Sequence, residues 1–119
     1  MKGREGFNPY MTKDMSHMIL KLIMLRKIEK NEVYSYALLK ELDNERICSL
    51  LKKKVGGVKN DIYNTAKALE KSGYISVTAR IENGKLKKYY RITANGKKAI
   101  VESKKLFLNS MKELMNIVG

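Results

Sequence analysis

Hydrophobic and polar residues follow a helical period over the first third of the chain. One helix is predicted from Thr12, a suitable N-cap, to about Lys30, and its apolar residues are Met15, Met18, Ile19, Leu22, Ile23 and Leu25. A second helix is predicted from Ser35 to about Asn44, with an apolar side made of Tyr36, Leu38, Leu39 and Leu42. Both patterns predict helices that bury one face against the rest of the protein.

The middle of the chain contains a less regular stretch and then a third helix. Residues 45–57 either continue the second helix or form a short separate turn before a loop, and the pattern leaves both open. Gly56 and Gly57 mark a break in either case. The third helix is predicted over about residues 59–72, with Asn60 as its N-cap and Gly73 as the glycine that ends it. Its inward residues are Ile62, Ala66 and Leu69.

Two β-forming runs flank Asn83-Gly84, the strongest short hairpin signal in the chain. A type I′ turn at these two residues places Arg80 opposite Lys87. Because side chains alternate along a strand, the hairpin then has two different faces. One face is expected in the core and consists of Ile75, Val77, Ile81, Leu86, Tyr90 and Ile92. The other is polar and basic and consists of Ser76, Thr78, Arg80, Lys85, Lys87, Tyr89 and Arg91.

A final helix is predicted from the N-cap Thr93 to about Ile117. Its apolar residues recur with the seven-residue spacing of helices that pair with other helices. This seam is predicted to form a dimer interface of Ile100, Phe107, Met111, Leu114 and Val118.

The order helix, helix, helix, hairpin, helix is that of a winged helix-turn-helix. The predicted fold class is therefore α+β, mostly α, with a two-stranded β wing and a long C-terminal dimerisation helix. Residues 1–11 are interpreted as a flexible N-terminal arm, residues 12–93 as the DNA-binding domain and residues 94–119 as the dimerisation helix.

Composition limits the classes of protein that fit. The 119 residues, 44% of them hydrophobic, suit one globular domain. No apolar stretch approaches the roughly 20 residues of a membrane span, and no secretion signal is evident, so we expect a cytoplasmic location and no membrane partner. Cys48 is the only cysteine, which excludes an internal disulfide, and its apolar neighbours favour a buried structural thiol.

The positive charge is concentrated in one region. The whole chain has a net charge of +13, and residues 52–98 hold thirteen Lys and Arg against three acidic residues, a net +10. Such a region attracts polyanions and gains free energy by releasing counterions from nucleic acid. Charge alone leaves DNA, RNA and anionic lipid as alternatives.

Polar residues on the third helix and the hairpin are the candidate contacts. Asn60, Asn64, Lys67 and Lys71 share the outward side of the helix, beside Asp61 and Thr65, and asparagine can pair with adenine while lysine reaches guanine or phosphate. Tyr63 is equally suited to a phosphate contact and to packing. The predicted DNA-binding residues are Lys59, Asn60, Tyr63, Asn64, Lys67, Arg80, Lys85, Lys87 and Lys88. Arg80 and Lys87 repel each other across the hairpin, and bound phosphates are expected to relieve this repulsion.

The sequence gives no support for an enzymatic function. It contains no phosphate-binding glycine loop, no nucleophile motif and only one histidine, so we predict no catalysis, no metal and no cofactor. The alternative to a sequence-specific regulator is an architectural protein that coats DNA without sequence preference.

Three segments together resemble the PadR-type transcriptional regulators. They are VYSYALLKEL, IYNTAKALEKSGYI and KKYYRIT followed two residues later by Gly96, and the resemblance spans about residues 19–100. The chain departs from the family in having Ser35-Tyr36 where Gly-Tyr is usual. The resemblance implies a homodimer that binds double-stranded DNA as a repressor or activator and pairs through its C-terminal helix with help from its N-terminal helix. Proteins of this family can also bind small effectors, but no ligand-binding motif supports an effector here.

Overall fold

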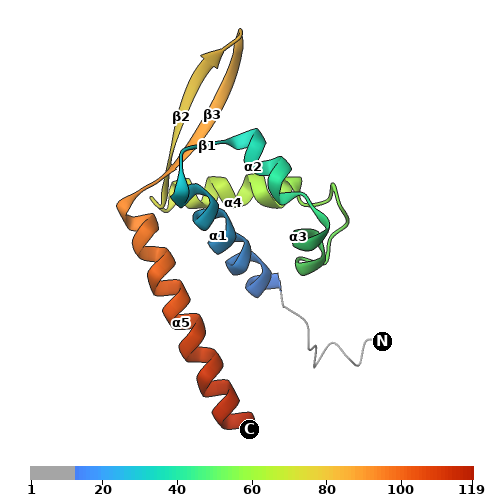
Figure 1. Cartoon of the computed structure of the whole chain (residues 1–119), viewed down its shortest axis with the longest axis vertical. Helices are drawn as coiled ribbons and strands as arrows, with labels where there is room; N and C mark the ends of the chain where they lie inside the picture. Colours follow the sequence, from blue (N-terminus) through green and yellow to red (C-terminus); the bar gives the residue numbers. More distant parts are fainter. Residues whose placement is uncertain (1–12) are drawn as a thin grey trace.

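The predicted order of elements is present in the computed structural model, which describes residues 13–119 (Figure 1). The helices are α1 (Lys13–Lys30), α2 (Ser35–Leu42), α3 (Glu45–Leu50), α4 (Lys59–Lys71) and α5 (Ala94–Val118). The strands are β1 (Val33–Tyr34), β2 (Ile75–Glu82) and β3 (Lys85–Ile92), which form an antiparallel sheet in the order β1-β3-β2. The predicted arm at residues 1–11 and the predicted N-cap at Thr12 lie outside the described residues.

The mostly helical winged helix-turn-helix is confirmed, but the sheet has one strand more than the sequence predicts. In β1, Val33 pairs with Tyr90 and Tyr34 pairs with Tyr89, both on β3. Two residues are too few to show the alternation by which a strand is recognised in a sequence. β1 matters for the site because it fastens the link between α1 and α2 to the hairpin.

The stretch left open by the sequence is a short helix followed by a loop. α3 is capped by Asn44, whose side-chain oxygen accepts a hydrogen bond from the Ile47 amide at 2.9 Å. The Asp43 carboxylate then fastens the loop by accepting from the Gly56 amide at 2.7 Å and from the Cys48 thiol at 3.5 Å. Burial, together with the hydrogen bond to Asp43, raises the pKa of the Cys48 thiol. The prediction of a buried structural thiol is confirmed.

The core lies between α1, α2 and α4, and the side of α1 that it uses matches the predicted one only in part. The buried residues of α1 are Leu20, Met24, Leu25 and Ile28, whereas Met15 and Met18 are exposed. The prediction holds for Leu25, and the predicted Leu22 and Ile23 pack against the core, but Leu20, Met24 and Ile28 were missed. They were missed because α1 is apolar around much of its circumference, and periodicity alone does not choose a side in such a helix. On α2 the predicted Leu38 and Leu42 are buried, but Tyr36 is exposed.

The predicted bounds of α4 are confirmed, but the predicted N-cap was wrong. Asn60 lies within the helix, and the N-cap is Val58, which has no capping side chain and is fully buried instead. Packing of an apolar residue at the helix start has therefore outweighed the local preference for asparagine. At the other end, Gly73 has a φ of +79°, as expected for the glycine that ends a helix.

The hairpin of β2 and β3 has the predicted register, with Arg80 opposite Lys87 and Ile81 opposite Leu86. Asn83 and Gly84 have φ values of 52° and 74°, as a type I′ turn requires. The predicted core face is buried only near its base, because the hairpin projects beyond the helices (Figure 1). Ile81 and Leu86 were wrongly expected in the core, since they are 78% and 67% exposed.

The start of α5 is fixed to the end of α4. The predicted N-cap Thr93 is confirmed, since its hydroxyl accepts from the Gly96 amide at 3.0 Å and donates to the Gly73 carbonyl at 2.6 Å. Gly96 and Ile100 are buried, after which α5 leaves the core (Figure 1). Ile100, which was predicted in the dimer interface, is 2% exposed and belongs to the core of its own chain.

Candidate nucleic-acid interface

The outer side of α4 presents a row of polar side chains. Asn60, Asn64, Lys67 and Lys71 are all exposed and lie three or four residues apart, so they share one side of the helix. The opposite side is buried as predicted and consists of Ile62, Ala66 and Leu69. Thr65 does not belong to the outer row, since it is only 7% exposed and its hydroxyl donates to the carbonyl of Asp61 at 2.6 Å.

Tyr63 lies at the edge between these two sides of α4. It is half exposed, and the Lys67 Nζ lies 4.8 Å from the centre of its ring. A lysine at this distance is attracted to the negative face of the aromatic ring. The ring of Tyr63 thus helps to hold the charge of Lys67 on the outer side of α4.

The three lysines of the hairpin differ in their surroundings. Lys85 and Lys88 are exposed, and neither forms an ion pair within residues 13–119. The side chain of Lys87 is only 25% exposed, and its Nζ lies 3.7 Å from the Glu82 carboxylate and 5.1 Å from the centre of the Tyr34 ring. Lys85 and Lys88 are therefore more available to an external anion than Lys87.

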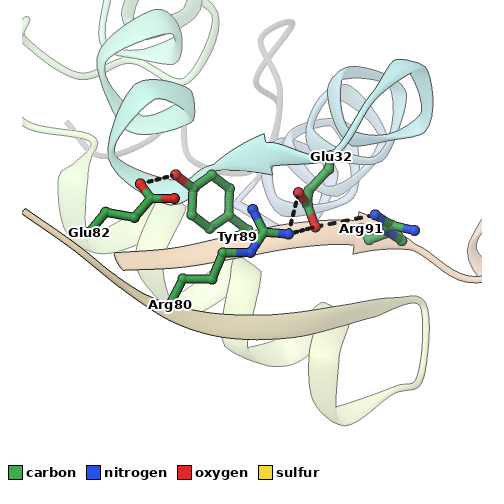
Figure 2. Close-up of polar contacts among 5 residues, drawn as sticks. All are labelled: Glu32, Arg80, Glu82, Tyr89 and Arg91. Atoms are coloured by element: carbon green, nitrogen blue, oxygen red, sulfur yellow. Dashed lines mark hydrogen bonds and ion pairs between the residues drawn. The ribbon is translucent and has the colours of Figure 1, made fainter. Parts of the chain in front are cut away.

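Arg80 is engaged inside the protein. Figure 2 shows its guanidinium directed at Glu32, where Nη2 donates to Oε1 at 2.7 Å and to Oε2 at 2.8 Å. Arg91 approaches the same carboxylate, with Nη2 at 3.4 Å from Oε2. The hydrogen bond from Arg80 lowers the pKa of Glu32, and the same bond raises the pKa of Arg80. One carboxylate thus contacts side chains from both strands of the hairpin.

Tyr89 was expected to be exposed on the basic face, but it is half-buried. Its hydroxyl donates to Glu82 Oε1 at 2.6 Å, and this bond raises the pKa of the phenol (Figure 2). The Arg80 guanidinium lies 4.3 Å from the centre of its ring, and the ring of Tyr34 lies 5.5 Å away. Packing against β1, the strand that the sequence did not reveal, accounts for this burial.

Glu32 is the residue of this region that the sequence did not identify. Arg80 and Lys87 do face each other, but the structure places Glu32 beside the first and Glu82 beside the second. The protein itself therefore offsets the repulsion that was expected to be relieved by phosphates. The repulsion between Arg80 and Lys87 was the sequence signal that could have pointed to Glu32, because two facing positive charges require an acidic residue or a bound anion nearby.

A second exposed surface, of opposite character, lies on α5. Its apolar residues are Val101, Leu106, Phe107, Leu108, Met111, Leu114, Met115, Ile117 and Val118, and all of them are exposed. At 3.6 residues per turn they cover more than half of the helix circumference. The predicted interface residues Phe107, Met111, Leu114 and Val118 belong to this apolar surface.

A family model described as the transcriptional regulator PadR-like family matches residues 24–102. The chain belongs to this family. The matched range begins within α1 and ends within α5, so it includes α4 and the whole hairpin, which is the wing of the PadR-like fold. The chain is accordingly a DNA-binding transcription regulator.

Solved structures of other regulators share this PadR-like fold. A transcriptional regulator from Clostridium thermocellum is 23% identical with a TM-score of 0.69, and the match covers 92% of this chain and 99% of that one. A PadR-family transcriptional regulator from Eggerthella lenta is 20% identical with a TM-score of 0.68, covering 88% and 86%. A PadR-like transcriptional regulator from Bacillus cereus is 24% identical with a TM-score of 0.64, covering 88% and 96%. No curated protein matches the chain significantly.

Two further observations concern the described part of this PadR-like chain. Within residues 13–119 no three side chains of His, Cys, Asp or Glu are grouped so that they could hold a metal ion. None of the helices in the same range is long and apolar enough to cross a membrane.

Proposed function

We propose that this PadR-like chain binds specific DNA sequences as a homodimer, with α4 in the major groove and the wing on the backbone or in the minor groove. The observation that carries the proposal is the row of exposed asparagine and lysine side chains on α4. Asn60 and Asn64 can each pair with adenine through two hydrogen bonds, and Lys67 can reach guanine or a phosphate. Lys59 and Tyr63 lie at the borders of this row and are proposed to contact the backbone.

The wing supplies contacts that do not depend on sequence. Lys85 and Lys88 are proposed to bind phosphates, because both are exposed and free of ion pairs within the described chain. Lys87 is proposed as a weaker contact, since Glu82 lies close to its charge. Arg80 was predicted as a contact, but its bonds to Glu32 favour a different role, which is developed below.

Dimerisation is supported by the apolar surface of α5. Monomeric proteins rarely expose large continuous apolar surfaces, and a second copy of α5 is the simplest partner for this one. Met15 and Met18 of α1 are exposed as well and are proposed to extend the interface. A two-fold dimer would place two α4 helices in successive major grooves, with half-sites about 34–36 Å apart.

Selection of bound fragments from random duplex DNA at physiological salt tests the proposal. We expect a palindromic motif with two half-sites. Asn64→Ala should change the preferred bases at one position per half-site, since a pair of hydrogen bonds to a base contributes about 1–3 kcal/mol of discrimination. Asn109→Ala, a matched change on the polar side of α5, should leave the motif unchanged. Equal recovery of all sequences by the unmodified protein would favour the architectural alternative instead.

A further inference from the structure

The wing is held on two faces by two kinds of contact. On one face, Val77 and Tyr90 at its base pack against the core. On the other, the Glu32 carboxylate contacts Arg80 of β2 and Arg91 of β3 (Figure 2). The apolar contacts are confined to the base of the wing, and Ile81, further along β2, is exposed. The bonds of Glu32 reach Arg80, the residue next to Ile81, and so hold the wing beyond the apolar contacts.

Glu32 is itself held in a fixed place. It lies two residues after the end of α1 and directly before β1, whose two residues pair with β3. The neighbouring ring of Tyr34 lies against Tyr89 at 5.5 Å. The Glu32 side chain is 21% exposed, so water competes only partly with its arginine partners. A carboxylate placed in this way can transmit the position of α1 to both strands of the wing.

We propose that Glu32 is a positioning residue for DNA binding, which fixes the angle between the wing and α4 by holding Arg80 and Arg91. The inference rests on the proposed function, because the angle matters only if α4 and the wing contact the same duplex. In that geometry Lys85 and Lys88 reach phosphates at a set distance from the bases read by Asn60 and Asn64. A wing that swings freely still attracts DNA, but it no longer favours the register in which α4 meets its preferred bases.

The ratio of specific to non-specific affinity distinguishes a positioning role of Glu32 from a purely electrostatic one. Removing a negative charge from a DNA-binding surface by itself raises the affinity for every duplex. Loss of a positioning residue lowers the preference for the selected sequence over unrelated DNA. Glu32→Gln removes the charge and keeps the size, so simple electrostatics predicts an unchanged ratio of specific to non-specific affinity, whereas positioning predicts a lower ratio.

The experiment compares Glu32→Gln with Glu70→Gln in the full-length protein. Glu70 is exposed on α4, and its neutralisation serves as the matched charge control. We expect Glu32→Gln to lower the ratio of specific to non-specific affinity by about tenfold, which is the size of one lost base contact. Glu70→Gln should raise both affinities and leave their ratio nearly unchanged. Glu32→Asp keeps the charge on a shorter side chain and should give an intermediate ratio.

Hydrogen exchange of the free proteins provides a readout that does not depend on DNA. Backbone amides of β2 and β3 should exchange faster in Glu32→Gln than in the unmodified protein or in Glu70→Gln, with the core helices unchanged. An unchanged specificity ratio in Glu32→Gln, or unchanged exchange in the wing, would overturn the proposal. If the unmodified protein prefers no sequence, the proposed function fails, and the exchange measurement alone decides whether Glu32 holds the wing.

Discussion

The wing and α5 both project from the helical core, but their exposed surfaces have opposite chemistry (Figure 1). The free side chains near the wing tip include Lys85 and Lys88, which favour an anionic partner. Those of α5 include Phe107, Met111 and Leu114, which favour an apolar partner. The contrast fits the two tasks proposed for the chain, since one projection suits DNA and the other suits a second copy of the protein.

The two projections also differ in how they are held. The wing is braced by the pairing of β1 with Tyr89 and Tyr90, by the bonds of Glu32 to Arg80, and within the hairpin by the bond between Tyr89 and Glu82. Within the described residues, the buried positions of α5 are Gly96 and Ile100, both in its first turns. Isolated helices are only marginally stable in water, and most helical stability in proteins comes from packing. The outer part of α5 is therefore expected to depend on a partner, whereas the wing is complete within one chain.

The largest expected effect comes from placing a charge on the apolar surface of α5. Met111→Glu should weaken dimerisation by at least about a hundredfold, because burying an unpaired carboxylate costs several kcal/mol. DNA binding should fall with it, since one α4 helix reads too few bases to be specific. Sedimentation at micromolar concentration measures the result.

A matched control keeps the same charge on the same helix. Asn116→Glu adds one carboxylate on the polar side of α5, about 140° around the helix from Met111. This variant should sediment as the unmodified protein does. A dimer that persists in Met111→Glu, or one that is lost equally in both variants, would show that the apolar surface of α5 is not the interface.

The next effect concerns the junction from which both projections start. A Cβ added at Gly96 would collide with the backbone carbonyl of Tyr74, which already accepts a hydrogen bond from the Thr93 amide at 3.1 Å. Gly96→Ala should destabilise the fold by about 1–3 kcal/mol, as overpacking usually does, even though alanine is the better helix former. Thermal unfolding measures the loss. The neighbouring change Asn95→Ala, at an exposed position, should leave the stability equal or slightly higher.

Much of this architecture follows from local sequence signals, and the departures have a common cause. Asn83-Gly84 fixes the register of the wing, and Thr93 fixes the start of α5, because both act through their own backbone neighbours. The buried side of α1 and the burial of Ile100 depend on which surfaces meet in three dimensions. The partnership of Glu32 and Arg80 joins residues 48 positions apart, which no local pattern reveals.

A smaller effect is expected from removing the lysines of the wing one at a time, which tests which of them contact phosphates. Lys85→Ala and Lys88→Ala should each weaken binding to all duplexes and reduce the slope of log affinity against log salt by about one unit. Lys87→Ala should change the slope less, because Glu82 and the Tyr34 ring already hold that charge. Binding measured between about 50 and 200 mM salt gives the slopes. Equal slopes for all three variants and the unmodified protein would show that these wing lysines do not contact DNA phosphates.

The smallest expected effect is the pH dependence of the stability that the contact between Glu32 and Arg80 contributes. The pKa of Glu32 is lowered in the folded protein from its ordinary value of 4.5, chiefly by the hydrogen bond from Arg80. A carboxyl with a lowered folded pKa stabilises the fold fully above its unfolded pKa, and this contribution is lost as the pH falls through the folded pKa. The melting temperature of the unmodified protein should therefore exceed that of Glu32→Gln by more at pH 6 than at pH 3. Arg80→Met should shrink this difference, because it removes the hydrogen bond that chiefly lowers the pKa of Glu32. A difference that stays the same at both pH values would mean that the Glu32 carboxylate does not brace the wing through its charge, and the bracing would then have to come from β1 and Tyr89 alone.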